Sequence, residues 1–494
     1  MDNNLNRYGR VFLVGAGPGD PGLLTLRGKE LLEQADVVIY DYLADSALLE
    51  FAKATAVMID VGKRPNRPTP QNEINDVIIG ACLKSEIVVR LKGGDPMLFG
   101  RGGEELEALT RAGIRYEVVP GVTSAIAVPA FAGIPVTHRG VSTSLTIITG
   151  HRQANAADDT DFGALVRLGG TIVVLMGVEN RGIIASRLMN AGMDPKTPIA
   201  AIRWGTRPDQ STVRGQIDQL ESLEIFSPAT IVIGSVAGFN FDFFESRPLF
   251  GKSIVITRDP AQQGQLERRL KLLGARVISA PTIKIVPPKD AYVALDESIA
   301  RLDEYSFLIF TSTNAVSAFF GRLDDLRKLG KIKIAAVGSA TRDAILKYRI
   351  GVDIMPQSYV GDSLLAEFPD GNGERILIPR AFKARDVLPK GLRLKGYEVT
   401  IVPAYETQLN ESVDVDGELL ANADAICFTS SSTVQNFVKI FGSKCVPRKS
   451  ISIGPVTSQA MRALNLNPTV EAKEHNLDGL IRSAIDLMGP DMGQ

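Results

Sequence analysis

The chain has 494 residues, more than one ordinary hydrophobic core organises, so we expect roughly two to four domains. Hydrophobic residues make up 45% and charged residues 22% of the chain, a balance typical of globular proteins. The formal net charge of −1 excludes nucleic-acid binding through bulk positive charge, although a local basic pocket remains compatible with it.

The three cysteines, Cys82, Cys427 and Cys445, lie far apart and form no CxxC pair. We therefore expect neither a disulfide framework nor a structural zinc site, and the three histidines, in unrelated contexts, do not indicate any other metal site. The polar N-terminal segment lacks the apolar core of a secretory signal, and the apolar runs are too short to cross a bilayer. The sequence thus predicts a cytoplasmic protein without a membrane or nucleic-acid partner.

Short β-branched runs alternate with amphipathic helical stretches, which predicts α/β domains with largely parallel sheets. A helical pattern over 23–35 is one example of the connecting helices. In the first half of the chain the predicted strands are 10–14, 36–40, 57–61, 87–91, 116–119, 145–149, 171–176, 198–202 and 229–234.

The segment 239–252 interrupts this alternation with several phenylalanines and a proline, and a new strand is predicted at 253–257. We interpret it as a boundary between two halves, with a linker at 241–250 that its aromatic side chains dock. The alternative is a surface loop within one large domain.

An internal repeat is present in the second half. Phe310-Thr311-Ser312 followed by Gly338 is repeated as Phe428-Thr429-Ser430 followed by Gly454, at nearly equal separations. Each copy is typical of a strand, a Thr-Ser turn, a helix, a second strand and a glycine turn. The repeat predicts two similar α/β lobes that face a cleft; the alternative is a chance similarity between strands that end in glycine.

A glycine-rich turn, GAGPGD at 15–20, follows a predicted strand and opens a helix. Such a turn lets the backbone approach a ligand closely. Its G-x-G-x-G spacing differs from the dinucleotide pattern, and Pro18 lacks the amide donor that a pyrophosphate needs, so it gives little support to a nicotinamide site. A tight connection between strand and helix is the other interpretation.

Further motifs occur with this turn in a fixed order: GAGPGDPGLLTLRG (15–28), VVIYD (37–41), VGKR (61–64), VVRLKGGDPMLFGRGGEE (88–105), VVPGVTSA (118–125), GIPVTHR (133–139) and LMG (175–177). Through them, residues 8–240 closely resemble the uroporphyrinogen-III C-methyltransferases of the tetrapyrrole methylase family. The resemblance implies two α/β lobes, S-adenosylmethionine bound between them, and a homodimer formed through this domain. GGDP and GAGPGD alone identify only the wider family, which includes corrin methylases and members that modify RNA or diphthamide.

The resemblance also implies a set of cofactor-binding residues. They are Pro18, Gly93, Gly94, Asp95, Leu98, Thr123, Ser124, Met176, Gly205 and Ala229. The Gly93-Gly94 turn permits close approach of the backbone, Asp95 suits an ammonium or hydroxyl groups, and Met176 suits packing against adenine. Taken singly, Met176 is more typical of a hydrophobic core, and Thr123 and Ser124 of a helix N-cap.

Two residues at predicted strand ends are implied to move protons: Asp41 as acceptor and Lys63 as donor. The chemistry is consistent, because a pyrrole carbon that attacks the sulfonium methyl must afterwards lose a proton. The alternatives are a turn-forming aspartate and a solvated lysine. Uroporphyrinogen is a polycarboxylate, so we expect a basic cleft, built from residues at or near the motifs: Lys63, Arg64, Arg67, Lys92, Arg101, Arg139 and Arg152. Among these, Arg64, Arg101 and Arg139 are the predicted substrate-binding residues; scattered surface charges are the alternative.

Residues 251–488 resemble the uroporphyrinogen-III synthases through GKSIVITRDPAQQGQLERRLKLLGARVISAPTIKI (251–285), IFTSTNAV (309–316), AAVGSAT (335–341), ILIPRA (376–381), VPAYET (402–407), CFTSSSTV (427–434) and ISIGPVTSQA (451–460). The resemblance implies that Tyr405 is the acid that assists hydroxyl departure, with a tyrosine that caps the core as the alternative. Groups suited to the substrate carboxylates are Thr311, Ser312, Thr429, Ser430, Arg258 and Arg380.

The sequence therefore predicts two consecutive enzymes of tetrapyrrole synthesis, which convert hydroxymethylbilane to uroporphyrinogen III and then to precorrin-2 for siroheme or cobalamin. One alternative keeps the methyltransferase and makes the second half a non-catalytic tetrapyrrole-binding module. Another makes the first half an RNA-directed methylase, against which the near-neutral charge counts.

Overall fold

The structure is a computed structural model that describes residues 9–42, 45–62, 69–150, 160–257, 260–356, 361–384 and 386–490. The chain divides into two compact units. Unit 1 consists of Met1–Lys252 with Leu270–Arg276 and Met488–Gln494, and unit 2 consists of Ser253–Arg269 with Val277–Leu487. Both units are α/β in class, as the alternating sequence pattern predicts.

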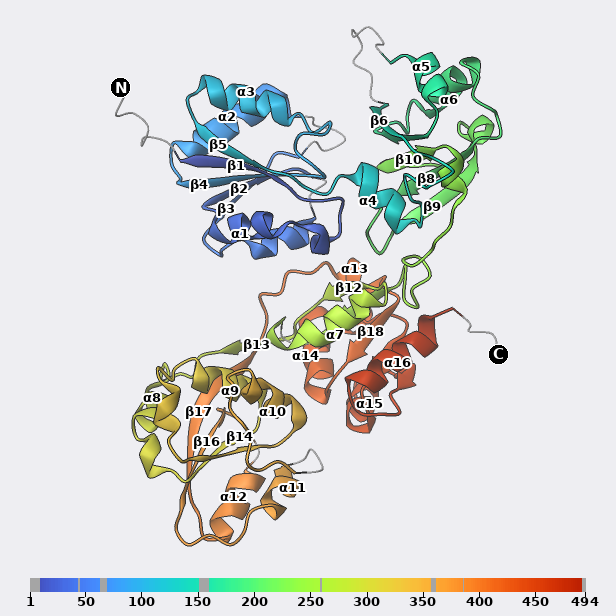
Figure 1. Cartoon of the computed structure of the whole chain (residues 1–494). Coiled ribbons are helices and arrows are strands. Elements are labelled where there is room, and N and C mark those ends of the chain that lie inside the picture. Colours follow the sequence, from blue (N-terminus) through green and yellow to red (C-terminus); the bar gives the residue numbers. More distant parts are fainter. Residues whose placement is uncertain are drawn as a thin grey trace, which may run out of the picture. The chain divides into compact units, whose positions relative to one another are not determined.

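The first sheet of unit 1 is parallel throughout and has the strand order β3-β2-β4-β1-β5. Its strands are β1 (Arg10–Gly15), β2 (Val37–Tyr40), β3 (Val57–Asp60), β4 (Ile87–Lys92) and β5 (Arg115–Val119). Helix α1 (Leu26–Gln34) covers one face, and α2 (Gln71–Cys82) and α3 (Gly102–Arg111) cover the other (Figure 1). Because both faces are covered, β4 buries Val88 on the side of α2 and Val89 on the side of α1.

The second sheet of unit 1 has the order β6-β7-β10-β8-β9. Its strands are β6 (Leu145–Thr149), β7 (Thr171–Leu175), β8 (Pro198–Arg203), β9 (Ser211–Gln216) and β10 (Ala229–Ile233). Helix α4 (Ser124–Phe131) packs on one face, and α5 (Phe162–Leu168) and α6 (Arg181–Asn190) pack on the other (Figure 1).

Only β6 and β7 pair in parallel in this second sheet, while β10 pairs antiparallel with β7 and β8, and β8 pairs antiparallel with β9. The expectation of largely parallel sheets is therefore wrong here. For β8 and β9 the physical reason is the short connection between them, since a parallel pair needs a crossover of a dozen residues or more.

Unit 2 is built around a third sheet, β12-β11-β18-β19-β20, and a fourth sheet, β13-β17-β16-β14-β15. The strands of the third sheet are β11 (Ser253–Ile256), β12 (Arg276–Ser279), β18 (Ala425–Phe428), β19 (Ser450–Ser452) and β20 (Val470–Glu471). The strands of the fourth are β13 (Ile283–Val286), β14 (Phe307–Phe310), β15 (Lys333–Ala336), β16 (Arg375–Ala381) and β17 (Glu398–Leu409). In the fourth sheet β13 pairs antiparallel with the end of β17, and the remaining pairs are parallel.

The remaining α-helices follow in chain order. They are α7 (Pro260–Leu272), α8 (Val293–Ala300), α9 (Thr313–Phe320), α10 (Ser339–Leu346), α11 (Gly361–Ala366), α12 (Val387–Leu394), α13 (Gly417–Ala421), α14 (Ser431–Phe441), α15 (Pro455–Arg462) and α16 (Leu477–Met488). Short 3₁₀ helices are η1 (Pro21–Leu23), η2 (Ser46–Phe51), η3 (Ile217–Gln219), η4 (Ser235–Gly238), η5 (Leu302–Glu304), η6 (Leu326–Leu329) and η7 (Ser443–Cys445).

The internal repeat corresponds to two similar strand-and-helix blocks in different sheets of unit 2. One block runs through β14, α9, β15 and α10, and the other through β18, α14, β19 and α15. Ser312 caps the N-terminus of α9 by accepting a hydrogen bond from the Ala315 amide, and Ser430 caps α14 in the same way from the Thr433 amide. The repeated serine therefore has a structural role, because each helix needs a side chain to satisfy its free amides.

The phenylalanine-rich segment 239–252 is docked on unit 1. Phe244 is 4% exposed, and its ring centroid lies 4.8 Å from that of Phe131 and 5.4 Å from that of Phe250. The Phe241 amide donates to the Gly133 carbonyl over 2.9 Å. These contacts agree with the expected docking, and the proposed limits of the two domains, 8–240 and 251–488 with a linker at 241–250, stay predictions.

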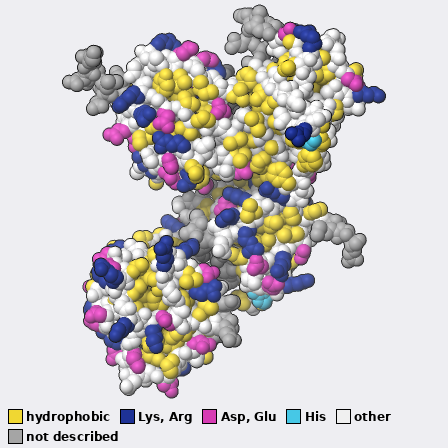
Figure 2. All heavy atoms as spheres, in the orientation of Figure 1, with side chains coloured by type: hydrophobic (Ala, Val, Ile, Leu, Met, Phe, Trp, Pro, Cys, Tyr) yellow, Lys and Arg dark blue, Asp and Glu magenta, His cyan; other side chains and the backbone are white. Residues whose placement is uncertain are grey.

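Charged side chains of both signs are mixed on the surface. On the face drawn in Figure 2, Lys and Arg side chains are scattered among Asp and Glu side chains. This face therefore carries no broad basic field that could attract a polyanion by charge alone. In the described part of the chain, no helix combines the length and the apolar character that crossing a bilayer requires.

Candidate functional site

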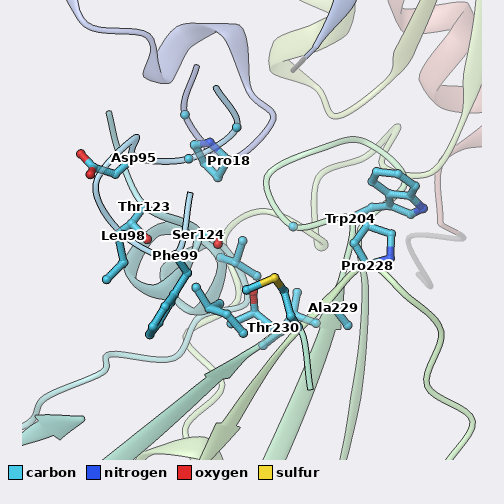
Figure 3. A pocket seen from close by; sticks show the side chains of 18 of the residues that line it. Pro18, Asp95, Leu98, Phe99, Thr123, Ser124, Trp204, Pro228, Ala229 and Thr230 are labelled. Carbon is cyan, nitrogen blue, oxygen red and sulfur yellow. The ribbon is translucent and has the colours of Figure 1, made fainter. Parts of the chain in front are cut away.

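A pocket of about 210 Å³ in unit 1 is lined by loops and strand ends of both its sheets. From the first sheet and α4 come Gly17, Pro18, Gly93, Gly94, Asp95, Leu98, Phe99, Gly100, Thr123, Ser124 and Val128. From the second sheet come Leu175, Met176, Ile202, Trp204, Gly205, Arg207, Pro228, Ala229 and Thr230. In Figure 3, Asp95, Leu98 and Thr123 lie across the pocket from Trp204 and Pro228. All ten residues predicted to bind the cofactor lie in this lining.

Three glycines bring the loops after β1, β4 and β5 into direct contact. A Cβ atom on Gly121 would lie 2.2 Å from the Gly94 carbonyl oxygen and 2.7 Å from the Gly15 Cα. Gly94 and Gly17 also exchange two backbone hydrogen bonds, of 2.8 and 3.2 Å. The backbone itself thus forms one wall of the pocket, because no side chain fits between these loops.

Asp95 fixes this arrangement. Its Oδ2 accepts a hydrogen bond from the Gly121 amide at 3.0 Å, and its Oδ1 accepts one from the Met97 amide at 2.8 Å. Asp95 lines the pocket as predicted, but its carboxylate oxygens are engaged by backbone amides. We conclude that its first role is to tie the β4 turn to the β5 turn.

Strained backbone gathers around the pocket. Nine non-glycine residues among the described ones have positive φ, and five of these belong to the pocket or its adjoining loops. They are Phe99 (52°), Arg101 (58°), Met176 (54°), Trp204 (48°) and Thr206 (71°). Non-glycine residues adopt this conformation at an energetic cost and typically where a site requires a particular side-chain direction.

The structure bears on the alternatives for three of the predicted residues, whose roles in cofactor binding stay predictions. Met176 follows an apolar strand, yet its side chain is 52% exposed and lines the pocket, so it is not part of the core. Thr123 is a helix N-cap, because its hydroxyl accepts the Ala125 amide at 3.2 Å, and it lines the pocket as well. Ser124 is the first residue of α4, and Figure 3 shows its side chain at the pocket.

Asp41 lies at the carboxyl end of β2 and is held by a buried arginine. Arg90 Nη2 donates to Asp41 Oδ1 over 2.6 Å, while 29% of the Asp41 side chain stays exposed. Lys92, which the sequence places in the basic cleft, is instead buried and paired with Glu105 Oε1 at 2.8 Å, so that expectation is wrong. Burial, and then the neighbouring charge of Arg90, lower the pKa of Lys92.

In unit 2, Tyr405 of β17 lies against the Thr-Ser turn that follows β14. Its hydroxyl donates to Ser312 Oγ over 3.1 Å, and its ring packs on the hydrophobic cluster between the fourth sheet and α9. Thr311 is exposed beside this pair. Thr429 and Ser430 occupy the corresponding turn after β18 in the third sheet. The structure thus brings Tyr405 and Ser312 together.

Residues 10–221 match the family model of tetrapyrrole (corrin/porphyrin) methylases, and residues 264–482 match that of uroporphyrinogen-III synthase HemD. The porphyrin biosynthesis protein HemD of Ruminiclostridium josui is 38% identical over 502 residues, which cover 98% of this chain and 99% of that protein. The chain belongs to the tetrapyrrole methylase family in its first half and to the uroporphyrinogen-III synthase family in its second.

Other known proteins are similar to the methylase half. The uroporphyrinogen-III C-methyltransferase of Priestia megaterium is 47% identical over 237 residues, which cover 47% of this chain and 100% of that protein. A crystal structure of the uroporphyrin-III C-methyl transferase of Thermus thermophilus complexed with S-adenyl homocysteine is also similar. The two sequences are 40% identical, and the match covers 46% of this chain and 98% of that chain with a TM-score of 0.41.

Several pocket residues of the methylase half were not predicted from the sequence, and Trp204 and Arg207 are two of them. The Arg207 guanidinium lies 4.8 Å from the centre of the Trp204 ring, and its Nη2 is 3.8 Å from Asp45 Oδ2. Thr206 Oγ1 accepts the Asp20 amide at 3.0 Å, so this loop contacts the loops after β1 and β2. One signal was available, since Trp204 is the only tryptophan of the chain and precedes the predicted Gly205.

The remaining predicted residues lie outside the pocket lining or outside the described part of the chain. Arg101 is exposed beside the pocket residue Gly100 and pairs with Glu104 at 2.5 Å. Arg139 is exposed in a turn and is not part of the pocket lining. In the synthase half, Arg380 pairs with Asp386 at 2.6 Å. Residues outside the described part of the chain are Lys63, Arg64, Arg67, Arg152 and Arg258.

Proposed function

We propose that the chain is a bifunctional enzyme of tetrapyrrole synthesis. The synthase half cyclises hydroxymethylbilane to uroporphyrinogen III with inversion of ring D. The methylase half then transfers two methyl groups from S-adenosylmethionine to uroporphyrinogen III, which gives precorrin-2, the precursor of siroheme and cobalamin. The observation that carries this proposal is the convergence of widely separated motifs, from Pro18 to Ala229, on one pocket.

The lining of this pocket suits S-adenosylmethionine. The N-terminus of α4, which begins at Ser124, presents the positive end of the helix dipole, which suits a carboxylate. Met176, Leu98 and Ala229 offer an apolar wall for adenine. A Cβ atom on Gly94 would have only the Ser124 amide nitrogen, at 3.9 Å, near it, so the space above this turn is open to a ligand. When bound, the cofactor supplies an electrophilic methyl group.

We assign the proton steps of methylation to Asp41 and Lys63. Asp41 accepts the proton that the methylated macrocycle must lose, and its exposed fraction, 29%, leaves it accessible to a substrate while Arg90 holds one of its oxygens. Lys63 is proposed as the proton donor, and Arg64, Arg101 and Arg139 as partners of the substrate carboxylates.

The synthase half has a lighter chemical task. Hydroxymethylbilane expels its hydroxyl largely through its own pyrrole nitrogens, so the enzyme mainly holds the chain in the conformation that closes the last ring inverted. We assign to Tyr405 the donation of a proton to the departing hydroxyl; its contact with Ser312 at 3.1 Å sets the direction of its phenol. Thr311, Ser312, Thr429 and Ser430 are proposed to bind the substrate carboxylates.

The test is to supply the purified protein with hydroxymethylbilane, with and without S-adenosylmethionine. We expect uroporphyrinogen III without the cofactor and precorrin-2 with it. Recovery of the symmetrical type I isomer alone, at the spontaneous rate, contradicts the synthase assignment and favours a non-catalytic tetrapyrrole-binding module. Failure of added uroporphyrinogen III to accept methyl groups contradicts the methylase assignment. A cytoplasmic location and a homodimer formed through the methylase half complete the proposal, and analytical ultracentrifugation tests the latter.

A further inference from the structure

The hydrophobic layer between the first sheet and helices α2 and α3 contains a group of buried charges at its carboxyl end. The side chains of Arg90, Lys92 and Glu105 are 1%, 4% and 0% exposed. Arg90 and Lys92 are two residues apart on β4 and so lie on the same face of the sheet, and Glu105 comes from α3. Arg90 is the largest of the fully buried side chains in the described residues.

These charges form one network with Asp41. Glu105 Oε1 accepts hydrogen bonds from Lys92 Nζ at 2.8 Å, from Arg90 Nε at 3.2 Å and from Gln71 Nε2 at 3.3 Å. The other edge of the Arg90 guanidinium donates to Asp41 Oδ1 over 2.6 Å. Arg90 thus bridges two carboxylates, a buried one on α3 and a partly exposed one at the end of β2, and the network holds equal numbers of positive and negative groups.

The position of this network also links it to the cofactor turn. The main-chain carbonyl of Lys92 accepts the Ala16 amide at 2.7 Å, and the next two residues are Gly93 and Gly94 of the pocket. In the sheet order β2-β4-β1, Asp41, Lys92 and Gly15 end neighbouring strands. Adjacent strands are about 4.8 Å apart, so the network lies beside the turn that lines the pocket.

Stability alone does not account for such a group. Desolvating charges costs as much as their attraction returns, and replacing buried ion pairs with apolar residues is often neutral or stabilising. Buried charges with a specific partner at the ligand end of a sheet are typical of functional sites. A rigid guanidinium fork is also the group best suited to fix the direction of a carboxylate.

We propose that Arg90 is the positioning residue of the methylation reaction, that it fixes the carboxylate of Asp41, and that Glu105 and Lys92 fix Arg90. This inference rests on the proposed function, in which Asp41 accepts the proton. Arg90 acts through Asp41 and does not touch the substrate. Removing it leaves the pocket intact and misplaces the acceptor, and a misplacement of about 1 Å costs about a hundredfold in rate.

The experiment is a double-mutant cycle on the full chain with Arg90→Met, Asp41→Asn and the combined variant. We expect Arg90→Met to lower kcat for methylation about a hundredfold, with KM for S-adenosylmethionine and the Kd for S-adenosylhomocysteine changed less than about threefold. Because Arg90 acts through Asp41, the combined variant should be no slower than Asp41→Asn alone. Arg90→Lys, which keeps a donor to Asp41, should recover part of the rate.

Two measurements on the same preparations check that each variant is folded. Synthase activity reports on the other half of the chain, and S-adenosylhomocysteine binding reports on the pocket. Arg27→Met removes an exposed ion pair between α1 and β5, with Glu117 at 3.3 Å, and should leave both activities unchanged. The combined variant Arg90→Met/Glu105→Gln leaves Lys92 opposite Asp41 and so keeps the network neutral if Arg90→Met alone fails to fold.

The outcomes distinguish the proposed role of Asp41 as proton acceptor from the proposed role of Arg90 as positioning residue. Full methylation by Asp41→Asn contradicts the assignment of Asp41 in the proposed function. An inactive Asp41→Asn together with a fully active Arg90→Met overturns only the positioning role. Loss of S-adenosylhomocysteine binding in Arg90→Met, Arg90→Lys and the neutral double variant shows a purely structural role, and strictly multiplicative losses in the cycle do the same.

Discussion

Gly121 offers the sharpest test of the pocket geometry. In the variant Gly121→Ala, the added methyl group would lie 2.2 Å from the Gly94 carbonyl oxygen and 2.7 Å from the Gly15 Cα. Both atoms belong to the backbone, so no side chain can rotate away, and the loops after β1 and β4 must move apart by about 1 Å. We expect a loss of about 3 kcal/mol in the stability of unit 1, the upper part of the usual range for overpacking.

The displaced segment contains the Gly93-Gly94 turn, so function should fall together with stability. We expect the methylation rate to fall about a hundredfold and the affinity for S-adenosylhomocysteine to weaken. Trp204 provides the assay, because it is the only tryptophan and lines the pocket. Its fluorescence follows both ligand titration and the unfolding of unit 1 in urea, while the synthase rate of the same preparation serves as an internal reference.

Gly103→Ala is the matched control. No atom lies within 4 Å of a Cβ atom on Gly103, which is inside α3, so alanine should stabilise the helix by about 0.5–1 kcal/mol and leave methylation unchanged. If Gly121→Ala binds S-adenosylhomocysteine as tightly as the parent protein and unfolds at the same urea concentration, the close approach of the three loops is refuted.

Three further predictions address other parts of the chain. Tyr405→Phe removes the hydroxyl that donates to Ser312 and should lower the synthase rate at least about tenfold. Methylation of added uroporphyrinogen III should be unchanged. An unaltered synthase rate contradicts the assignment of Tyr405 as the acid. Burial raises the pKa of the Cys82 thiol from 9.0 to about 11, so as pH rises the unfolded chain loses this proton before the folded chain does. The free energy of unfolding therefore falls between pH 9.0 and about 11, by up to about 2.7 kcal/mol. The urea midpoint of Cys82→Ala should therefore decline less over this window, and an equal decline excludes the thiol as the cause. Phe244→Ala, at a position 4% exposed, should destabilise unit 1 by about 3–5 kcal/mol, whereas Phe243→Ala, at a position 52% exposed, should cost far less; equal effects in urea unfolding contradict docking of this segment.

Much of unit 1 could be predicted from the sequence because its central strands are buried on both faces. β1 and β7 contain continuous apolar runs, at 11–14 and 172–175, whose strand character does not depend on distant partners. The residues around the pocket could be predicted because a turn such as Gly93-Gly94 is defined by local backbone requirements and is carried by long motifs.

What the sequence did not reveal depends on tertiary contacts. β9 was missed because none of its residues is fully buried and it includes Gly215, so its strand conformation comes from pairing with β8 at the edge of the sheet. The sequence places Lys92 in a basic cleft because it belongs to one of the motifs and a polycarboxylate substrate requires such a cleft. Its burial is decided by Glu105, which is contributed by a different element, α3.

The clip between Asp95 and the Gly121 amide, together with the paired backbone of Gly17 and Gly94, has a consequence for how a ligand is received. The conformational entropy of these loops is lost when the chain folds. Binding of a small molecule therefore causes little further loss of entropy in them. The wall of the pocket is therefore preorganised. It discriminates between ligands by the shape that the loops already have before binding, rather than by closing around the ligand.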